Sequence, residues 1–80
     1  MTTTVTNENG FIRATYDSSN IASSTYDTAN YTLHITFVKG NLIYKYENVN
    51  PEDYNQLQNS ESTGKAFIEF IKNKYQGVKI

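Results

Sequence analysis

The stretch YTLHITFVKGNLIYKYENV, residues 31–49, decides the fold class. Its first half alternates apolar with polar residues, which is the period-two pattern of a half-buried β-strand. The apolar positions are Tyr31, Leu33, Ile35 and Phe37. Gly40 marks a turn because glycine readily adopts positive φ, and residues 42–49 then resume the alternation. The stretch therefore predicts an antiparallel hairpin.

The residues before the hairpin predict further strands. Residues 11–16 and 21–26 are rich in β-forming side chains, and the turn-forming residues 17–20 separate them. Residues 1–10 are polar and show no apolar periodicity, so we expect a loose arm or a short edge strand there.

The residues after the hairpin predict two helices. Asn50 followed by Pro51 is a typical helix start, and the acidic pair after them suits the positive end of the helix dipole, so a helix is expected over 51–58. A second helix is expected over 63–75, with an apolar stripe at intervals of four. Gly77 is expected to end that helix.

Together these elements predict one α+β domain over residues 1–80. We expect a small antiparallel sheet of three to four strands, including the hairpin 31–49, followed by two helices packed on one face. The predicted core residues are Leu33, Ile35, Phe37, Leu57, Phe67 and Ile71. His34 is expected on the opposite, non-core face of its strand.

Composition excludes several kinds of chemistry. The chain has no Cys and a single His, so neither a thiolate metal site nor a histidine-based zinc site is expected. No nucleophile, base and orienting group fall together, so we expect no enzyme activity and no cofactor. The net charge of −1 argues against binding to duplex DNA. No apolar run is long enough for a membrane span, so a cytoplasmic protein is expected.

Two motifs are candidates for ligand binding. Tyr44 and Tyr46 flank a lysine on one strand face, where they either pack in the core or stack on a ligand. Ser62-Thr63-Gly64-Lys65 stands at a helix start, where backbone N–H groups and a lysine suit a phosphate or carboxylate. The alternative interpretation is a capped helix whose glycine packs against the sheet.

The sequence resembles the KTSC domain family. The resemblance extends from residue 18 to residue 76 and is carried by Ser18, Ser19, Asn20, Ile21, Ala22, Tyr26, Asp27, Phe37, Gly40, Tyr44, Tyr46, Val49, Pro51, Tyr54, Leu57, Ser62, Gly64, Lys65, Phe67, Ile71 and Tyr75. The family includes the C-terminal domain of some lysyl-tRNA synthetases and stand-alone proteins of bacteria and phages. The resemblance implies RNA binding as one function. Ile68, and lysines in place of arginines in the last helix, depart from the family pattern and argue against a long RNA track.

The sequence thus predicts a non-enzymatic module that binds a phosphate-bearing, nucleotide-type ligand. A small or signalling nucleotide, sequestered in a bacterial cell or a phage-infected host, is favoured, with short RNA as a further candidate ligand. The expected ligand-binding residues are Ser18, Ser19, Asn20, Tyr44, Tyr46, Ser62, Gly64 and Lys65. The alternative is a protein–protein or self-assembly module. In either case we expect a homo-oligomer, a dimer or higher, that uses Ile68, Val78 and Ile80.

Overall fold

A computed structural model of the chain describes residues 2–80. Its centre is a six-stranded sheet in which each strand pairs antiparallel with the next along the chain. The strands are β1 (Thr2–Glu8), β2 (Phe11–Tyr16), β3 (Ile21–Asp27), β4 (Thr32–Phe37), β5 (Ile43–Tyr46) and β6 (Gly77–Lys79). A short 3-10 turn, η1 (Lys39–Asn41), joins β4 to β5, and Gly40 in it has φ 73°. The predicted α+β class and the hairpin are therefore confirmed.

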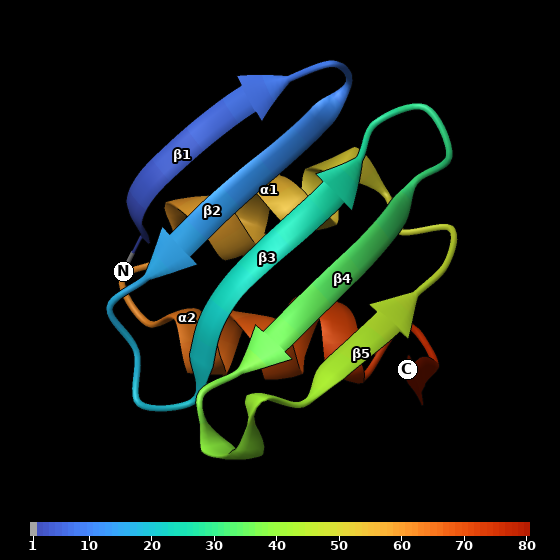
Figure 1. Cartoon of the computed structure of the whole chain (residues 1–80). Helices are drawn as coiled ribbons and strands as arrows, with labels where there is room; N and C mark the ends of the chain where they lie inside the picture. Colours follow the sequence, from blue (N-terminus) through green and yellow to red (C-terminus); the bar gives the residue numbers. More distant parts are fainter. Residues whose placement is uncertain (1) are drawn as a thin grey trace.

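The helices lie together on one face of the sheet (Figure 1). They are α1 (Pro51–Asn59) and α2 (Thr63–Ala66), which continues as a π-helical segment, η2 (Phe67–Lys72). Asn50 caps α1 as expected, because its side chain accepts the Glu52 backbone N–H at 2.9 Å. Among residues 2–80, no helix is long and apolar enough to cross a membrane.

The core lies between the sheet and the helices, with the strand register that the alternation predicts. Leu33 and Ile35 are fully buried, while His34 between them is on the other face and half-buried. Leu57, Phe67 and Ile71 come from the helices and are buried, and Phe37 is packed against them at the edge of the core. Thr and Ser residues predominate on the opposite, helix-free face, which accounts for the weak apolar signal of the outer strands.

The expected count of three to four strands is too low. β1 was left open as an arm or an edge strand, and it is a strand of seven residues. Its residues are mostly polar and show no apolar alternation, because an edge strand buries little of either face. β6 has only three residues and follows the helices, so its sequence gives no alternation to detect.

The second helix ends earlier than predicted. It stops at Lys72, so Tyr75 lies beyond it, and Gly77 begins β6 instead of ending the helix. Gly77 packs flat on Tyr46, since a Cβ added there would lie 2.6 Å from ring carbons of that tyrosine. The glycine is therefore required for close approach and not for a helix cap.

Candidate functional site

Two adjoining hollows open where the β2–β3 loop, η1 and the second helix meet. The larger, which we call the cleft, has a volume of about 820 Å³ and is lined by Ser19, Asn20, Phe37, Lys39, Gly40, Leu42, Tyr44, Tyr46, Gly64, Phe67, Ile68 and Lys72. The smaller, which we call the side hollow, has about 420 Å³ and is lined by Asp17, Ser18, Ser19, Asn20, Glu61, Ser62, Thr63, Gly64, Lys65 and Ile68. All eight predicted ligand-binding residues line one or both hollows.

Tyr44 and Tyr46, which the sequence left open as core or ligand-binding residues, have different surroundings in the aromatic wall of the cleft. Tyr46 is 4% exposed and meets Phe67 edge to face, with ring centroids 5.8 Å apart. Burial, with a smaller contribution from Tyr44, raises the pKa of Tyr46. Tyr44 is only half-buried and meets Phe37 at 90° and 5.5 Å. Tyr46 is thus a core residue with one edge at the cleft, while Tyr44 retains ring surface for a ligand.

The β2–β3 loop forms the polar rim shared by both hollows. Ser18 Oγ accepts the backbone N–H groups of Asn20 at 3.1 Å and Ile21 at 3.3 Å, which fixes the turn. The Asn20 carbonyl accepts the Val38 N–H at 2.9 Å and ties the loop to η1. The side chains of Ser19 and Asn20 remain exposed. Ser18 therefore shapes the rim, and its two neighbours present hydrogen-bonding groups.

The start of the second helix is capped by a side chain and is not an open site for a phosphate. The Ser62 hydroxyl accepts the Lys65 N–H at 3.5 Å, so one of the donors expected to be free is engaged. Gly64 faces the loop and not the sheet, because a Cβ there would lie 3.0 Å from the Asn20 side-chain nitrogen. The glycine lets the loop approach the helix and brings the predicted residues together.

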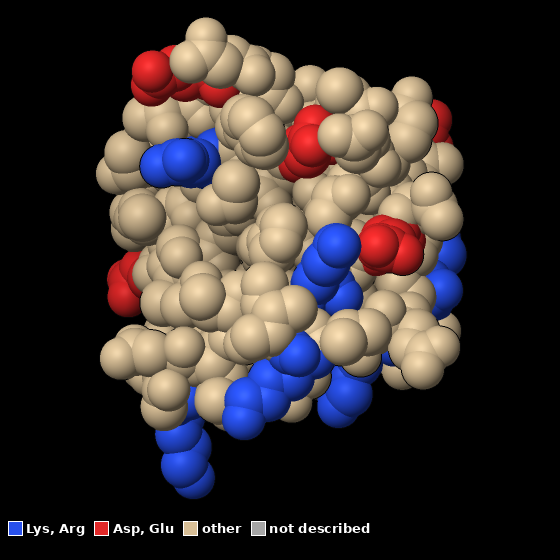
Figure 2. Space-filling model, turned by 45° about the vertical axis from the view of Figure 1, so that its right-hand side comes forward, with Lys and Arg blue, Asp and Glu red and all other residues tan. Residues whose placement is uncertain are grey.

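The two hollows differ in charge. Lys39 and Lys72 line the cleft, and none of the described residues in its wall is acidic. The side hollow contains Lys65 but also the carboxylates of Asp17 and Glu61. In Figure 2, basic side chains gather along the lower part of the face, and no acidic atoms lie among them. An anion is therefore favoured in the cleft over the side hollow.

Sequence reasoning missed Lys39 and Lys72 as site residues. Lys39 lies in η1 beside Gly40, and Lys72 is the last residue of η2. The two lysines are far apart in the sequence, so nothing local indicates that they line the same cleft. The only property that could have suggested an anion site is the positive charge of each residue. Across residues 2–80, no three His, Asp or Glu side chains gather in a way that could hold a metal ion.

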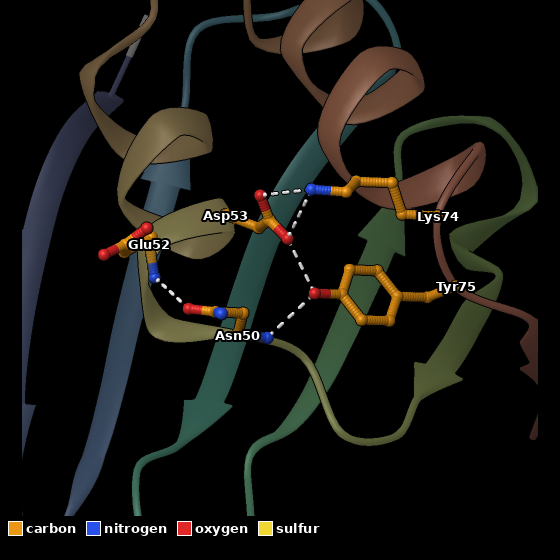
Figure 3. A network of polar contacts seen from close by, with 5 residues as sticks. All are labelled: Asn50, Glu52, Asp53, Lys74 and Tyr75. Carbon is orange, nitrogen blue, oxygen red and sulfur yellow. Dashed lines mark hydrogen bonds and ion pairs between the residues drawn. The ribbon is translucent and has the colours of Figure 1, made fainter.

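A second polar cluster lies at the start of α1 (Figure 3). Lys74 Nζ contacts both carboxylate oxygens of Asp53 at 3.1 Å, and the Tyr75 hydroxyl donates to Asp53 at 2.6 Å. The same hydroxyl accepts the Asn50 backbone N–H at 2.9 Å. We call these four residues the latch. The sequence interpretation treated Asp53 only as a helix-dipole partner, which was incomplete, because Asp53 is buried and anchors the C-terminal segment.

The latch shifts the pKa of its acidic residue. Burial by itself would raise the pKa of Asp53, but the hydrogen bonds from Tyr75 and Lys74 and the Lys74 charge outweigh it and hold the pKa below its usual value. Burial and the hydrogen bond to the carboxylate raise the pKa of Tyr75. The latch groups satisfy one another, so this cluster presents a structural role and not a binding site.

Comparisons with known proteins agree with this architecture. None of the curated proteins matches the chain. Among solved structures, the crystal structure of the KTSC domain protein YPO2434 from Yersinia pestis is similar, with 32% sequence identity and a TM-score of 0.77. That similarity covers 85% of this chain and 94% of the other. The family model for the KTSC domain matches residues 17–75, which include the rim, both tyrosines and both helices. The chain therefore belongs to the KTSC domain family.

Proposed function

We propose that the domain binds a small nucleotide-type ligand in the cleft and catalyses no reaction on it. The observation that carries the proposal is the cleft itself, which combines a partly exposed tyrosine ring, two lysines and a hydrogen-bonding rim. Base stacking, phosphate pairing and edge recognition are the three contacts by which proteins hold nucleotides.

The arrangement favours one orientation of the ligand. The base stacks on the free face of Tyr44, which Phe37 supports from the side. The phosphate lies between Lys39 and Lys72, away from the acidic side hollow. Asn20, whose amide both donates and accepts, lies on the shared rim and pairs with an edge of the base or with the ribose.

Size and charge favour a small ligand over extended RNA. At about 820 Å³ the cleft has the size of a small-molecule site. The chain carries eight acidic residues against seven basic ones, so it has no basic excess with which to neutralise a polymer. A short RNA remains a candidate through one or two nucleotides at its end.

Binding of a nucleotide panel to three lysine variants tests the proposal. The panel contains mono-, di- and cyclic nucleotides and a short RNA, screened by thermal shift and then titrated by calorimetry. Lys39→Ala and Lys72→Ala should each weaken the best ligand about tenfold, which is about 1.4 kcal/mol. Lys65→Ala is the matched control at the side hollow and should change affinity less than twofold.

Three outcomes contradict the proposal or its geometry. If no nucleotide or RNA raises the melting temperature, the function is wrong. If Lys65→Ala is the damaging variant, the phosphate lies at the helix start, as the sequence alone predicted. If Tyr44→Leu binds as tightly as the wild type, the base does not stack on that ring.

A further inference from the structure

The outer edge of β1 is the less protected of the two edges of the sheet. β1 has seven residues, four of them Thr and one Val, and its only charged residue is Glu8. β6 at the other edge has three residues, of which Gly77 weakens the strand and Lys79 carries a charge. Proteins guard exposed edges with short strands, lysines, prolines and bulges. β1 is long and has no Lys or Pro, and its one irregularity lies between Thr2 and Thr4, at its N-terminal end. None of the described residues pairs with its outer side.

The turn between β1 and β2 determines which backbone groups point outward. Asn9 and Gly10 both have positive φ, at 55° and 82°, as a two-residue hairpin turn requires. The residues that flank such a turn, Glu8 and Phe11, exchange hydrogen bonds, and bonded pairs then alternate along the ladder. Val5 falls in a non-bonded pair, so its N–H and C=O point away from β2.

We propose that β1 pairs antiparallel with β1 of a second copy of this chain, about a two-fold axis at Val5. Val5 is the midpoint of the strand, so this register gives the longest overlap that two copies can form. Val5 of each copy then donates to and accepts from Val5 of the other. The six strands of each copy become one continuous sheet across the axis.

The strand is self-complementary in this register. Thr4 of one copy lies opposite Thr6 of the other, and hydroxyl-bearing pairs of this kind stabilise antiparallel sheets. The two Glu8 residues fall at opposite ends of the paired region, about 20 Å apart at the usual rise per residue, so they do not repel one another. No lysine or arginine lies on β1 to oppose a like charge.

The side chains beside the axis favour the same contact. Val5 is 52% exposed and lies on the helix side of the sheet, where it lines a hollow of about 470 Å³ between β1 and α1. The other described residues of this hollow are uncharged, with Ile12 and Tyr54 at its base and Asn55 on its α1 side. Most of the lining is Thr, Asn or Gln. Pairing therefore brings the two Val5 side chains together beside a polar but uncharged surface and buries no charge.

Disulfide cross-linking of a single cysteine tests the register directly. The chain has no native Cys, so Val5→Cys introduces a unique thiol. Residues in a bonded antiparallel pair have Cα atoms about 5.5 Å apart, within the range that a disulfide spans. Under mild oxidation Val5→Cys should form a covalent dimer, whereas Val78→Cys on β6, which belongs to the surface that the sequence predicted for self-association, is the matched control and should remain monomeric.

Light scattering on the unmodified chain supplies the second measurement. At high micromolar concentration the wild type should have twice the 9.1 kDa mass of one chain, and Val5→Lys should return it to one chain by placing two ammonium groups at the axis. Circular dichroism should show both forms folded, because Val5 is half outside the core. A monomeric wild type, or cross-linking of Val78→Cys instead of Val5→Cys, would overturn the proposal.

Discussion

Both helical segments begin with a capping side chain, yet the two starts face different surroundings. At α1, the Asn50 cap accepts the Glu52 N–H at 2.9 Å, and Asp53 beside it is closed off by Lys74 and Tyr75. At α2, the Ser62 cap is longer, at 3.5 Å, and the exposed rim of the cleft lies next to it.

The difference separates a stability element from a binding element. The hydrogen-bonding groups of the latch bind one another within the chain. Removing one of them should therefore destabilise the fold and leave ligand binding in the cleft unchanged. Tyr44, Lys39 and Lys72 line the cleft, although Tyr44 also packs partly against the core. Variants at the two places should therefore change different measurements.

The largest effect on stability is expected from Asp53→Ala. The change removes the carboxylate that accepts hydrogen bonds from Lys74 and from the Tyr75 hydroxyl. The free energy of unfolding should therefore fall by about 2–3 kcal/mol. Urea denaturation measures this. Glu52→Ala is the matched control on the neighbouring exposed residue and should cost less than about 1 kcal/mol. Equal losses in the two variants would show that helix-dipole charge, and not the latch, matters.

A smaller effect is expected in acid, because protonated Asp53 can still accept a hydrogen bond. The folded-state pKa of Asp53 lies below the unfolded value of about 4, so its contribution is complete above pH 4. The part of this contribution that depends on the carboxylate charge should be lost as the pH falls through the lower, folded-state value. The unfolding free energy of Asp53→Asn should accordingly fall less steeply below pH 4 than that of the wild type. Parallel pH curves would contradict this account.

A still smaller loss of stability is expected for Tyr75→Phe. The ring stays, while the bonds to Asp53 and to the Asn50 N–H are lost, so the free energy of unfolding should fall by about 1–2 kcal/mol. Nucleotide affinity should be unchanged, since none of the latch residues lines the cleft. Calorimetric titration checks the second point, and a loss of affinity would show that the latch and the cleft are coupled.

The smallest change in stability is expected for Gly64→Ala. Alanine favours a helix by about 1 kcal/mol over glycine, but its Cβ would lie 3.0 Å from the Asn20 amide and push it outward. The two effects should nearly cancel in the melting temperature. Ligand affinity should nevertheless drop several-fold, because Asn20 forms the rim. A variant that binds normally would remove Asn20 from the site.

Much of the fold follows from local signals in the sequence. The alternation at Leu33 and Ile35 determined the hairpin and its register, because a period of two leaves only one choice of buried face. Asn50 and Ser62 marked both helix starts, since capping is a contact between residues two or three apart. Eight residues that line the two hollows were also named from the sequence, whereas the lysines of the cleft, Lys39 and Lys72, were not.

The remaining features depend on contacts between distant parts of the chain. Asp53 meets partners 21 and 22 residues away, and Lys39 shares the cleft with Lys72 from another element. Gly77 was assigned to a helix end because its packing on Tyr46 is invisible locally. β1 and β6 form because neighbouring strands offer them backbone partners, which needs no apolar pattern of their own. The sequence by itself determined the layers of this protein; the tertiary structure decided its edges, its latch and the charge of its cleft, because these arise only when separate elements meet.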